Sequence, residues 1–396
     1  MNQRKIAYDI LVKTISDESY SNLLMRQELN RVEPIQRAFV TNLVNGVLRK
    51  YELLEYQYAD QIKDNTSLSN RIILNMAMFE RFYLKEKDYV VNNEYVELAD
   101  NRYDKAFINA VLRNVSDFKE TEGSVAACLP EWIYRLLKAQ YDEETFHRIC
   151  ELYQQIPTVY YRINKRRCSY EDLKHLKIGI INDDVFTSEE NLLRTQEYRN
   201  GYFYVQDLNS ASLYKHLELE KGMNLLDVCS APGSKLFNCL DILAPEQCYA
   251  NDVNTGRVHL IETMAEKLGY EGIHYLNHDG RKLKDVLDTR FDRILLDAPC
   301  SGLGVIGRKP DLKFHIKPTG LDELQILQME LLQSMDPLLK KDGILLYSTC
   351  TLNKKENASL IRRFLEDHDD YELLDQDTLI RDSGDAFYYA AMRKKA

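Results

Sequence analysis

Two cysteines follow predicted strands in the last third of the chain. Cys300 lies in DAPCSG, after an apolar run that ends at Asp297, and Cys350 lies in YSTCT, after another. Because parallel strands place their carboxyl ends at one edge of a sheet, we expect both thiols on one rim. Asn353 and Glu356 have the spacing of a capping box, which predicts a helix N-terminus near Cys350. Its dipole would favour the nucleophilic thiolate.

A third loop, DVCSAPGSK, follows the expected strand 224–228. It is not a P-loop, because Ser234 separates Gly233 from Lys235, and it lacks the glycines of a dinucleotide fingerprint. A site for S-adenosylmethionine (SAM) needs only one glycine for close backbone approach. Acidic residues after three successive strands suit a cationic sulfonium and would repel a pyrophosphate. The residues therefore favour SAM.

A methyl donor beside a thiolate indicates one type of reaction. Carbon 5 of a pyrimidine is too weak a nucleophile for direct methylation, but addition of a thiolate at carbon 6 makes it enamine-like. Release then needs a second acid/base group to deal with the carbon-5 proton. Cys300 is well placed for that step, and Asp297 for a hydrogen bond to the cytosine edge.

The same segments resemble motifs I, IV and VI of the RNA 5-methylcytosine methyltransferases of the Nol/Nop/Sun family. They are DVCSAPGSK, DAPCSG with GVIGRKPDLKF after it, and YSTCTLNKKEN, and the ending SGDAFYYAAM resembles the family's last strand. The resemblance implies that Cys350 is the nucleophile and that Cys300 assists release. It also implies a SAM site lined by Cys229, Ser230, Ala231, Pro232, Gly233, Ser234, Lys235, Asp252, Asp279 and Asp297.

The chain departs from the family pattern at a few positions. Ser234 stands where a second glycine is usual, Leu236 where threonine is common, and Gly307 where an arginine is common. The first departure raises the question of a stiffer cofactor loop, and the last that of a missing RNA phosphate contact. None touches the two cysteines or the acidic residues, so we expect an active enzyme.

The elements that must position these loops begin at about residue 223. Short apolar strands there alternate with helices, which predicts a Rossmann-like α/β fold with a mostly parallel sheet. The expected strands are 224–228, 247–251, 273–277, 291–297 and 343–348, with helices at 257–268 and 321–339.

The N-terminal part shows helical spacing of apolar residues throughout 4–115, which predicts an all-α bundle. RAFVTNLVNGVLR, VNNEYVELA and KAFINAVLRNV resemble the NusB-like fold, which binds RNA and protein. We expect a NusB-like domain at 1–120, a connecting RNA-binding region at 121–217 and a methyltransferase domain at 218–396. The whole resemblance is nearest to the bacterial branch that methylates a cytosine in 16S ribosomal RNA.

The charge composition limits how the protein can bind RNA. The 396 residues carry 62 acids and 52 bases, a net charge of -10, which excludes indiscriminate coating of nucleic acid. Tyr160 and Tyr161 interleave with Arg162 and the bases of 165–167, a mixture typical of single-strand binding, although a solvated strand end explains it equally. Further bases cluster at 308–313, 340–341, 354–355 and 393–395, several of them expected near the catalytic rim.

The remaining predictions concern surroundings. Eight scattered cysteines without metal-site spacing predict free thiols and no metal. The N-terminal residues show no signal-peptide h-region, so we expect a cytoplasmic protein. No membrane segment is expected, and nothing demands more than a monomer. The predicted partner is 16S rRNA, free or partly assembled. Two alternatives stay open: a transfer-RNA 5-methylcytosine methyltransferase, and a non-catalytic RNA-binding or assembly protein.

Overall fold

The computed structural model describes residues 2–16 and 20–396. Their contacts form two compact units, one made of residues 1–156 and 306–317 and the other of 157–305 and 318–396. The chain therefore passes between the units three times. Residues 121–156 belong to the helical unit and 157–217 to the other, and the functional division into 1–120, 121–217 and 218–396 stays a prediction.

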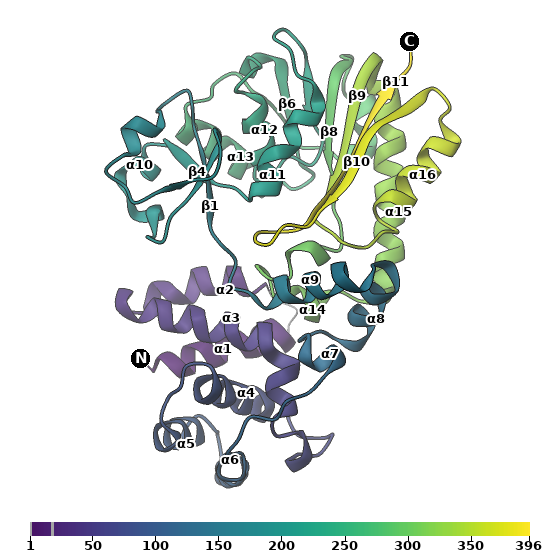
Figure 1. Ribbon diagram of the computed structural model, residues 1–396. Coiled ribbons are helices and arrows are strands. Elements are labelled where there is room, and N and C mark those ends of the chain that lie inside the picture. The colour runs from purple at the N-terminus through teal and green to yellow at the C-terminus, as the bar shows by residue number, and fades with distance from the viewer. Residues whose placement is uncertain (1, 17–19) are drawn as a thin grey trace. The chain divides into compact units, whose positions relative to one another are not determined.

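The first unit is helical (Figure 1). Its helices are α1 (Gln3–Ser16), α2 (Ser21–Glu28), α3 (Pro34–Tyr56), α4 (Leu68–Phe82), α5 (Asp88–Val96), α6 (Arg102–Asn114), α7 (Gly123–Ala126), α8 (Glu131–Gln140), α9 (Glu143–Gln154) and α14 (Leu312–His315). Ser67 and Asn101 cap α4 and α6 by accepting backbone N–H groups. The predicted bundle is confirmed.

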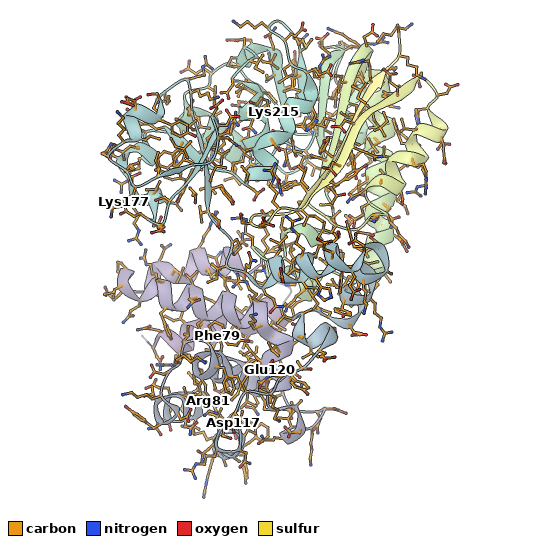
Figure 2. All side chains as sticks on the ribbon, in the orientation of Figure 1. Phe79, Arg81, Asp117, Glu120, Lys177 and Lys215 are labelled. Atoms are coloured by element: carbon orange, nitrogen blue, oxygen red, sulfur yellow. The ribbon has the colours of Figure 1, made fainter. Side chains whose placement is uncertain are left out.

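The core of this bundle forms where α3 and α4 meet. Val40, Leu43, Val44 and Val47 of α3 are fully buried, as their helical spacing predicts. Gly46 is required at the contact, because a Cβ there would lie 2.0 Å from the Phe79 ring. Figure 2 shows the Phe79 side chain in this unit.

The second unit contains a seven-stranded sheet of order β10-β11-β9-β8-β5-β6-β7. Strands β9, β8, β5, β6 and β7 are parallel, and β11 and β10 run antiparallel at one edge. Their bounds are β5 (Leu225–Asp227), β6 (Cys248–Asn251), β7 (His274–Leu276), β8 (Phe291–Asp297), β9 (Leu339–Thr349), β10 (Tyr371–Leu379) and β11 (Phe387–Lys394). Each predicted strand is present, which confirms the expected Rossmann-like fold.

Helices cover both faces of this sheet (Figure 1). On one face α12 (Ser234–Cys239) and α13 (Thr255–Leu268) pack Phe237 and Ile261 against Leu225 of β5. On the other, α15 (Pro318–Met335) and α16 (Ala358–Asp367) pack Leu332 and Phe364 against the strands. The two buried layers fix the strands, and with them the loops that leave their carboxyl ends.

A smaller sheet of order β2-β3-β1-β4 precedes the large one. Its strands are β1 (Tyr160–Ile163), β2 (Gly179–Ile180), β3 (Val185–Thr187) and β4 (Phe203–Val205). Tyr160, Tyr161 and Arg162 are all buried in it, with Tyr161 stacked on Phe186 and Arg162 bonded to Asp241 at 2.6 Å. The predicted RNA contact is therefore wrong for these three side chains, because β1 is a central strand covered on both faces.

Among the residues that the structure describes, no helix is long and apolar enough to span a bilayer. Among the same residues, no group of three or more His, Cys, Asp or Glu side chains is placed to hold a metal ion.

Candidate active site

The structure brings the two predicted cysteines together. Strands β8 and β9 are parallel neighbours in which Asp297 pairs with Ser348, so the loops after them leave the sheet side by side. The Sγ atoms of Cys300 and Cys350 lie 3.4 Å apart, within hydrogen-bond distance for thiols. Both residues are partly exposed. The arrangement allows two sulfur atoms to face one bound molecule.

The Cys300 thiol holds its proton tightly. The hydrogen bond to Cys350 and burial raise the pKa of the Cys300 thiol well above its usual value. Cys300 therefore keeps its proton at neutral pH and can share it with the sulfur of Cys350. Two interacting groups of this kind titrate as a pair.

Asp297 ends β8 and is held by two donors. Its Oδ2 accepts from Lys235 Nζ at 2.6 Å, and its Oδ1 accepts from the Ser348 hydroxyl at 2.8 Å. Burial alone would lower the pKa of Lys235, but the charge and hydrogen bond of Asp297, together with the charges of Cys350 and Asp227, outweigh burial and raise that pKa. The pair joins the cofactor loop to the cysteine strands and carries both a donor and an acceptor toward the rim.

The cofactor loop turns sharply between β5 and α12. Gly233 has φ of 97°, a left-handed conformation, and a Cβ there would lie 2.6 Å from the Phe237 ring, so glycine is required. The N–H of Ser230 donates to Asn251 O at 2.8 Å, which ties the loop to β6. Ser234 is already helical in α12, so the family's second glycine is not needed for this backbone.

Acidic and hydroxyl groups gather beneath this loop. Asp227 and Ser230 are buried, and their carboxylate and hydroxyl oxygens make no hydrogen bond of normal geometry within the described protein, although the Ser230 hydroxyl lies close enough to lower the pKa of Asp227. Burial raises the pKa of Asp227 to about 7. Asp252 is also buried, accepts from Asn254 N at 3.0 Å and lies 3.4 Å from Arg257. Buried acceptors with free lone pairs fit a ligand that brings ammonium and hydroxyl donors, as SAM does.

Asp279 differs from the other predicted acids. It follows β7 as expected, but its side chain accepts from Arg281 N at 3.0 Å and pairs with the Arg281 guanidinium at 2.6 Å. Hydrogen bonding from Arg281 lowers the pKa of Asp279. Its charge is already balanced, so its contact with SAM stays a prediction, as do those of Cys229, Ala231 and Pro232.

Two residues of this site were not predicted as site residues. Asp227 is the last residue of β5 and follows two leucines, so the sequence pattern indicates a position in the hydrophobic core and not a site residue. Glu356 was predicted as part of a capping box, and that prediction is wrong: α16 begins at Ala358, and Asn357 makes no side-chain cap. The Glu356 carboxylate instead accepts from Ser301 N at 2.9 Å.

The predicted basic clusters are not all at the rim. Lys313 is buried in the helical unit, paired with Glu52 and donating to Cys128 O at 2.9 Å, so it is not free for RNA. Gly307 is buried in the same unit, where Arg49 donates to its carbonyl at 3.0 Å. A side chain added there would lie 2.8 Å from Leu152 O, so the position does not face solvent.

The other clusters divide between the two ends of β9. Residues 340–341 begin this strand, and Arg393 pairs with Ile344, so both clusters lie toward the end opposite Cys350. Only the exposed pair 354–355 follows the cysteine closely.

A Rossmann-like sheet, a loop with buried acids and paired thiols at one edge define a SAM-dependent methyltransferase. The profile of the family described as "16S rRNA methyltransferase RsmB/F" matches residues 214–393, and that of the NusB family matches 1–117. The chain is 30% identical to "Probable ribosomal RNA small subunit methyltransferase B" of Bacillus subtilis, over 93% of this chain and 89% of that protein. It is 26% identical to "Ribosomal RNA small subunit methyltransferase B" of Yersinia enterocolitica, over 100% and 99% of the two chains.

Solved structures show the same fold. PH0851 aligns with a TM-score of 0.81 at 19% identity, over 100% of this chain and 99% of that one. NSun6 from Pyrococcus horikoshii aligns with a TM-score of 0.61 at 18% identity, over 68% and 99%. The chain belongs to the RsmB/F family of 16S rRNA methyltransferases. The predicted enzyme class, its SAM dependence and 5-methylcytosine formation in rRNA are thereby confirmed.

Proposed function

We propose that this methyltransferase forms 5-methylcytosine in 16S rRNA through a covalent bond between Cys350 Sγ and carbon 6 of the target cytosine. The observation that carries the proposal is the 3.4 Å separation of Cys350 and Cys300 beside the Lys235–Asp297 pair. Addition at one ring carbon and deprotonation at its neighbour require two such groups at one base. When bound, SAM supplies the electrophilic methyl group.

Each residue has a role that follows from its contacts. Cys350 Sγ, as the thiolate, donates its electron pair to carbon 6. Asp297 binds the cytosine edge, and the Lys235 cation that holds it balances the negative charge that moves into the ring. Once Cys350 is a thioether, its hydrogen bond and its charge no longer raise the pKa of Cys300, which leaves burial and the charge of Glu356. Cys300 must give up its own proton before it acts as the base. It takes the proton from methylated carbon 5, and the carbon–sulfur bond breaks to return the electron pair to Cys350.

The proposal also includes the RNA substrate, the cellular compartment and the oligomeric state. The family profile and full-length relatives support rRNA of the small subunit, rather than transfer RNA or a non-catalytic role. None of the eight cysteines, all within the described residues, forms a disulfide, which supports a reducing compartment such as the cytoplasm. A monomer acting on free or partly assembled 16S rRNA is part of the same proposal.

Two cysteine variants test the covalent route. Cys300→Ala, incubated with 16S rRNA and SAM, should accumulate an RNA adduct that survives denaturing gel electrophoresis. Cys350→Ala should form no adduct and lose at least about 1,000-fold in methylation rate, since the covalent step is removed. Cys150→Ala, at a partly exposed thiol of α9, is the control and should keep full activity. No adduct with either site variant would refute the assigned roles.

The cellular substrate needs a separate measurement. Bisulfite sequencing of ribosomal and transfer RNA from a strain lacking this protein should show one lost 5-methylcytosine in 16S rRNA. An unchanged 16S map would count against the substrate, whatever the adduct experiment shows.

A further inference from the structure

Glu356 has a carboxylate that is completely buried between the two cysteine loops, with 0% of the residue exposed. Four donors bond to it. Ser301 donates through its N–H to Oε2 at 2.9 Å and through its hydroxyl to Oε1 at 2.6 Å. Asn353 Nδ2 donates to Oε1 at 3.0 Å, and Gln328 Nε2 donates to Oε2 at 3.0 Å. Every lone-pair position of the carboxylate is therefore used.

The donors come from both cysteine loops. Ser301 directly follows Cys300, and Asn353 is the third residue after Cys350. A further bond joins the loops beside the carboxylate, between the hydroxyls of Ser301 and Thr351 at 2.7 Å. The position of each sulfur thus depends on a neighbour that is bonded, directly or through a hydroxyl, to the same group.

The fourth donor fixes this cluster to the helix layer. Gln328 lies on α15 and also donates to Pro299 O at 2.9 Å, just before Cys300. Helix α15 is packed on the sheet through Leu331 and Leu332. The first cysteine loop is therefore held from the strand, from the helix and from Glu356.

A carboxylate suits this centre better than an amide. It accepts at both oxygens and donates nothing, whereas an amide at the same place would present N–H groups to two donors. Charge-assisted bonds of this kind are shorter and stronger than neutral ones, and buried donors left without an acceptor are costly. The cluster therefore holds one geometry of the two loops.

We propose that Glu356 is a positioning residue that sets the separation of the Cys300 and Cys350 sulfur atoms. The proposal rests on the function proposed for those two cysteines. Glu356 acts on the two sulfur atoms through Ser301, Thr351 and Asn353. Its effect should thus be visible in the thiol pair itself, without RNA.

A thiol–disulfide equilibrium in the full chain measures the sulfur geometry. In glutathione buffers the two thiols are oxidised to a disulfide while one oxidised glutathione is reduced to two glutathione molecules. Glu356→Gln should lower the effective concentration of the pair about 10-fold or more. The same variant should lose about 100-fold in kcat, with KM for RNA changed less than about twofold.

The control removes an acid from β8, the strand that leads to Cys300, at the end far from the cysteine. Asp292 is the second residue of β8 and accepts from Asn224 N and Lys340 Nζ, both at 2.9 Å. Asp292→Asn should reduce thermal stability but leave the thiol equilibrium unchanged. An equal shift in Asp292→Asn, or an unchanged equilibrium in folded Glu356→Gln, would overturn the proposal.

A milder variant tests the same proposal if Glu356→Gln does not fold. Gln328→Met removes one donor of four and should lower the effective concentration about threefold; no change there would also overturn the proposal. If neither Cys300→Ala nor Cys350→Ala behaves as proposed while Glu356→Gln still separates the thiols, the covalent function fails and the positioning role stands.

Discussion

The two halves of the site differ in how their buried polar groups are satisfied. On the cysteine side, the Glu356 carboxylate and the Ser301 hydroxyl are bonded within the protein. On the cofactor side, the oxygens of Asp227 and the hydroxyl of Ser230 are buried without such bonds. Both sides lie at the carboxyl ends of neighbouring parallel strands. Position in the sheet alone therefore does not decide the chemistry of a loop.

The difference matches the two tasks that we propose for the halves. A nucleophile and its partner must hold one geometry through several steps, which internal bonds provide at the cost of adaptability. A cofactor pocket must offer acceptors to its ligand, and these destabilise the folded chain until they are used. Lys235 belongs to the cofactor loop and Asp297 to the cysteine strands, so their ion pair is where the two halves meet.

Within this comparison of the two halves, the largest expected effect comes from breaking the Lys235–Asp297 ion pair. Lys235→Met should lower kcat by about 100-fold or more, because it leaves the Asp297 carboxylate without its cation. Single-turnover methylation of 16S rRNA measures the loss. The double variant Lys235→Met with Asp297→Asn should regain stability, since no lone charge is left, but not activity. Wild-type turnover in Lys235→Met would show that the halves work independently.

The sequence predicts the fold better than the site because the parallel strands are buried apolar runs. β8 was predicted at its observed bounds 291–297, since such runs are visible without any partner. β10 was missed because it is an edge strand whose side chains are largely polar and exposed. The prediction of RNA contact at Tyr161 and Arg162 was wrong, because the alternation of aromatic and basic residues does not reveal that β1 is covered on both faces.

Within the site, the cysteines and acids could be located because strand ends meet at one edge. Glu356 could not be assigned in this way: its donors Ser301 and Gln328 lie 55 and 28 residues away in sequence. Its spacing from Asn353 also matches a common local motif that the structure does not form. Long-range acceptors of this kind have no local signature.

A second prediction tests whether the buried Asp227 carboxyl of the cofactor side lowers the free energy of unfolding. With its pKa raised from 3.8 to about 7, folded Asp227 keeps a proton that the unfolded chain loses at lower pH. Stability from this group therefore falls as pH rises from about 4 to about 7 and stays low above that. Asp227→Asn should raise the free energy of unfolding at pH 8 by up to the order of 4 kcal/mol.

The same variant should bind SAM at least about 10-fold more weakly at pH 8, and less so at pH 6, where the wild-type carboxylate is mostly protonated. Urea unfolding at pH 5 and 8, with titration calorimetry of SAM, gives both values. A variant less stable than the wild type at pH 8 would contradict the contrast between the two halves.

The smallest effect comes from a matched pair of serines, one in each half. Ser301 and Ser230 are similarly buried, at 4% and 6% exposure. The Ser301 hydroxyl is hydrogen-bonded to Glu356 and Thr351, whereas the Ser230 hydroxyl has only the Asp227 carboxyl near it, without a bond of normal geometry. Ser301→Ala should cost about 1 to 2 kcal/mol in free energy of unfolding, because it removes bonds to Glu356 and Thr351. Ser230→Ala removes an unsatisfied hydroxyl and should be neutral or slightly stabilising. Urea unfolding followed in the methyltransferase unit measures both, and equal costs would mean that the Ser230 hydroxyl is bonded after all.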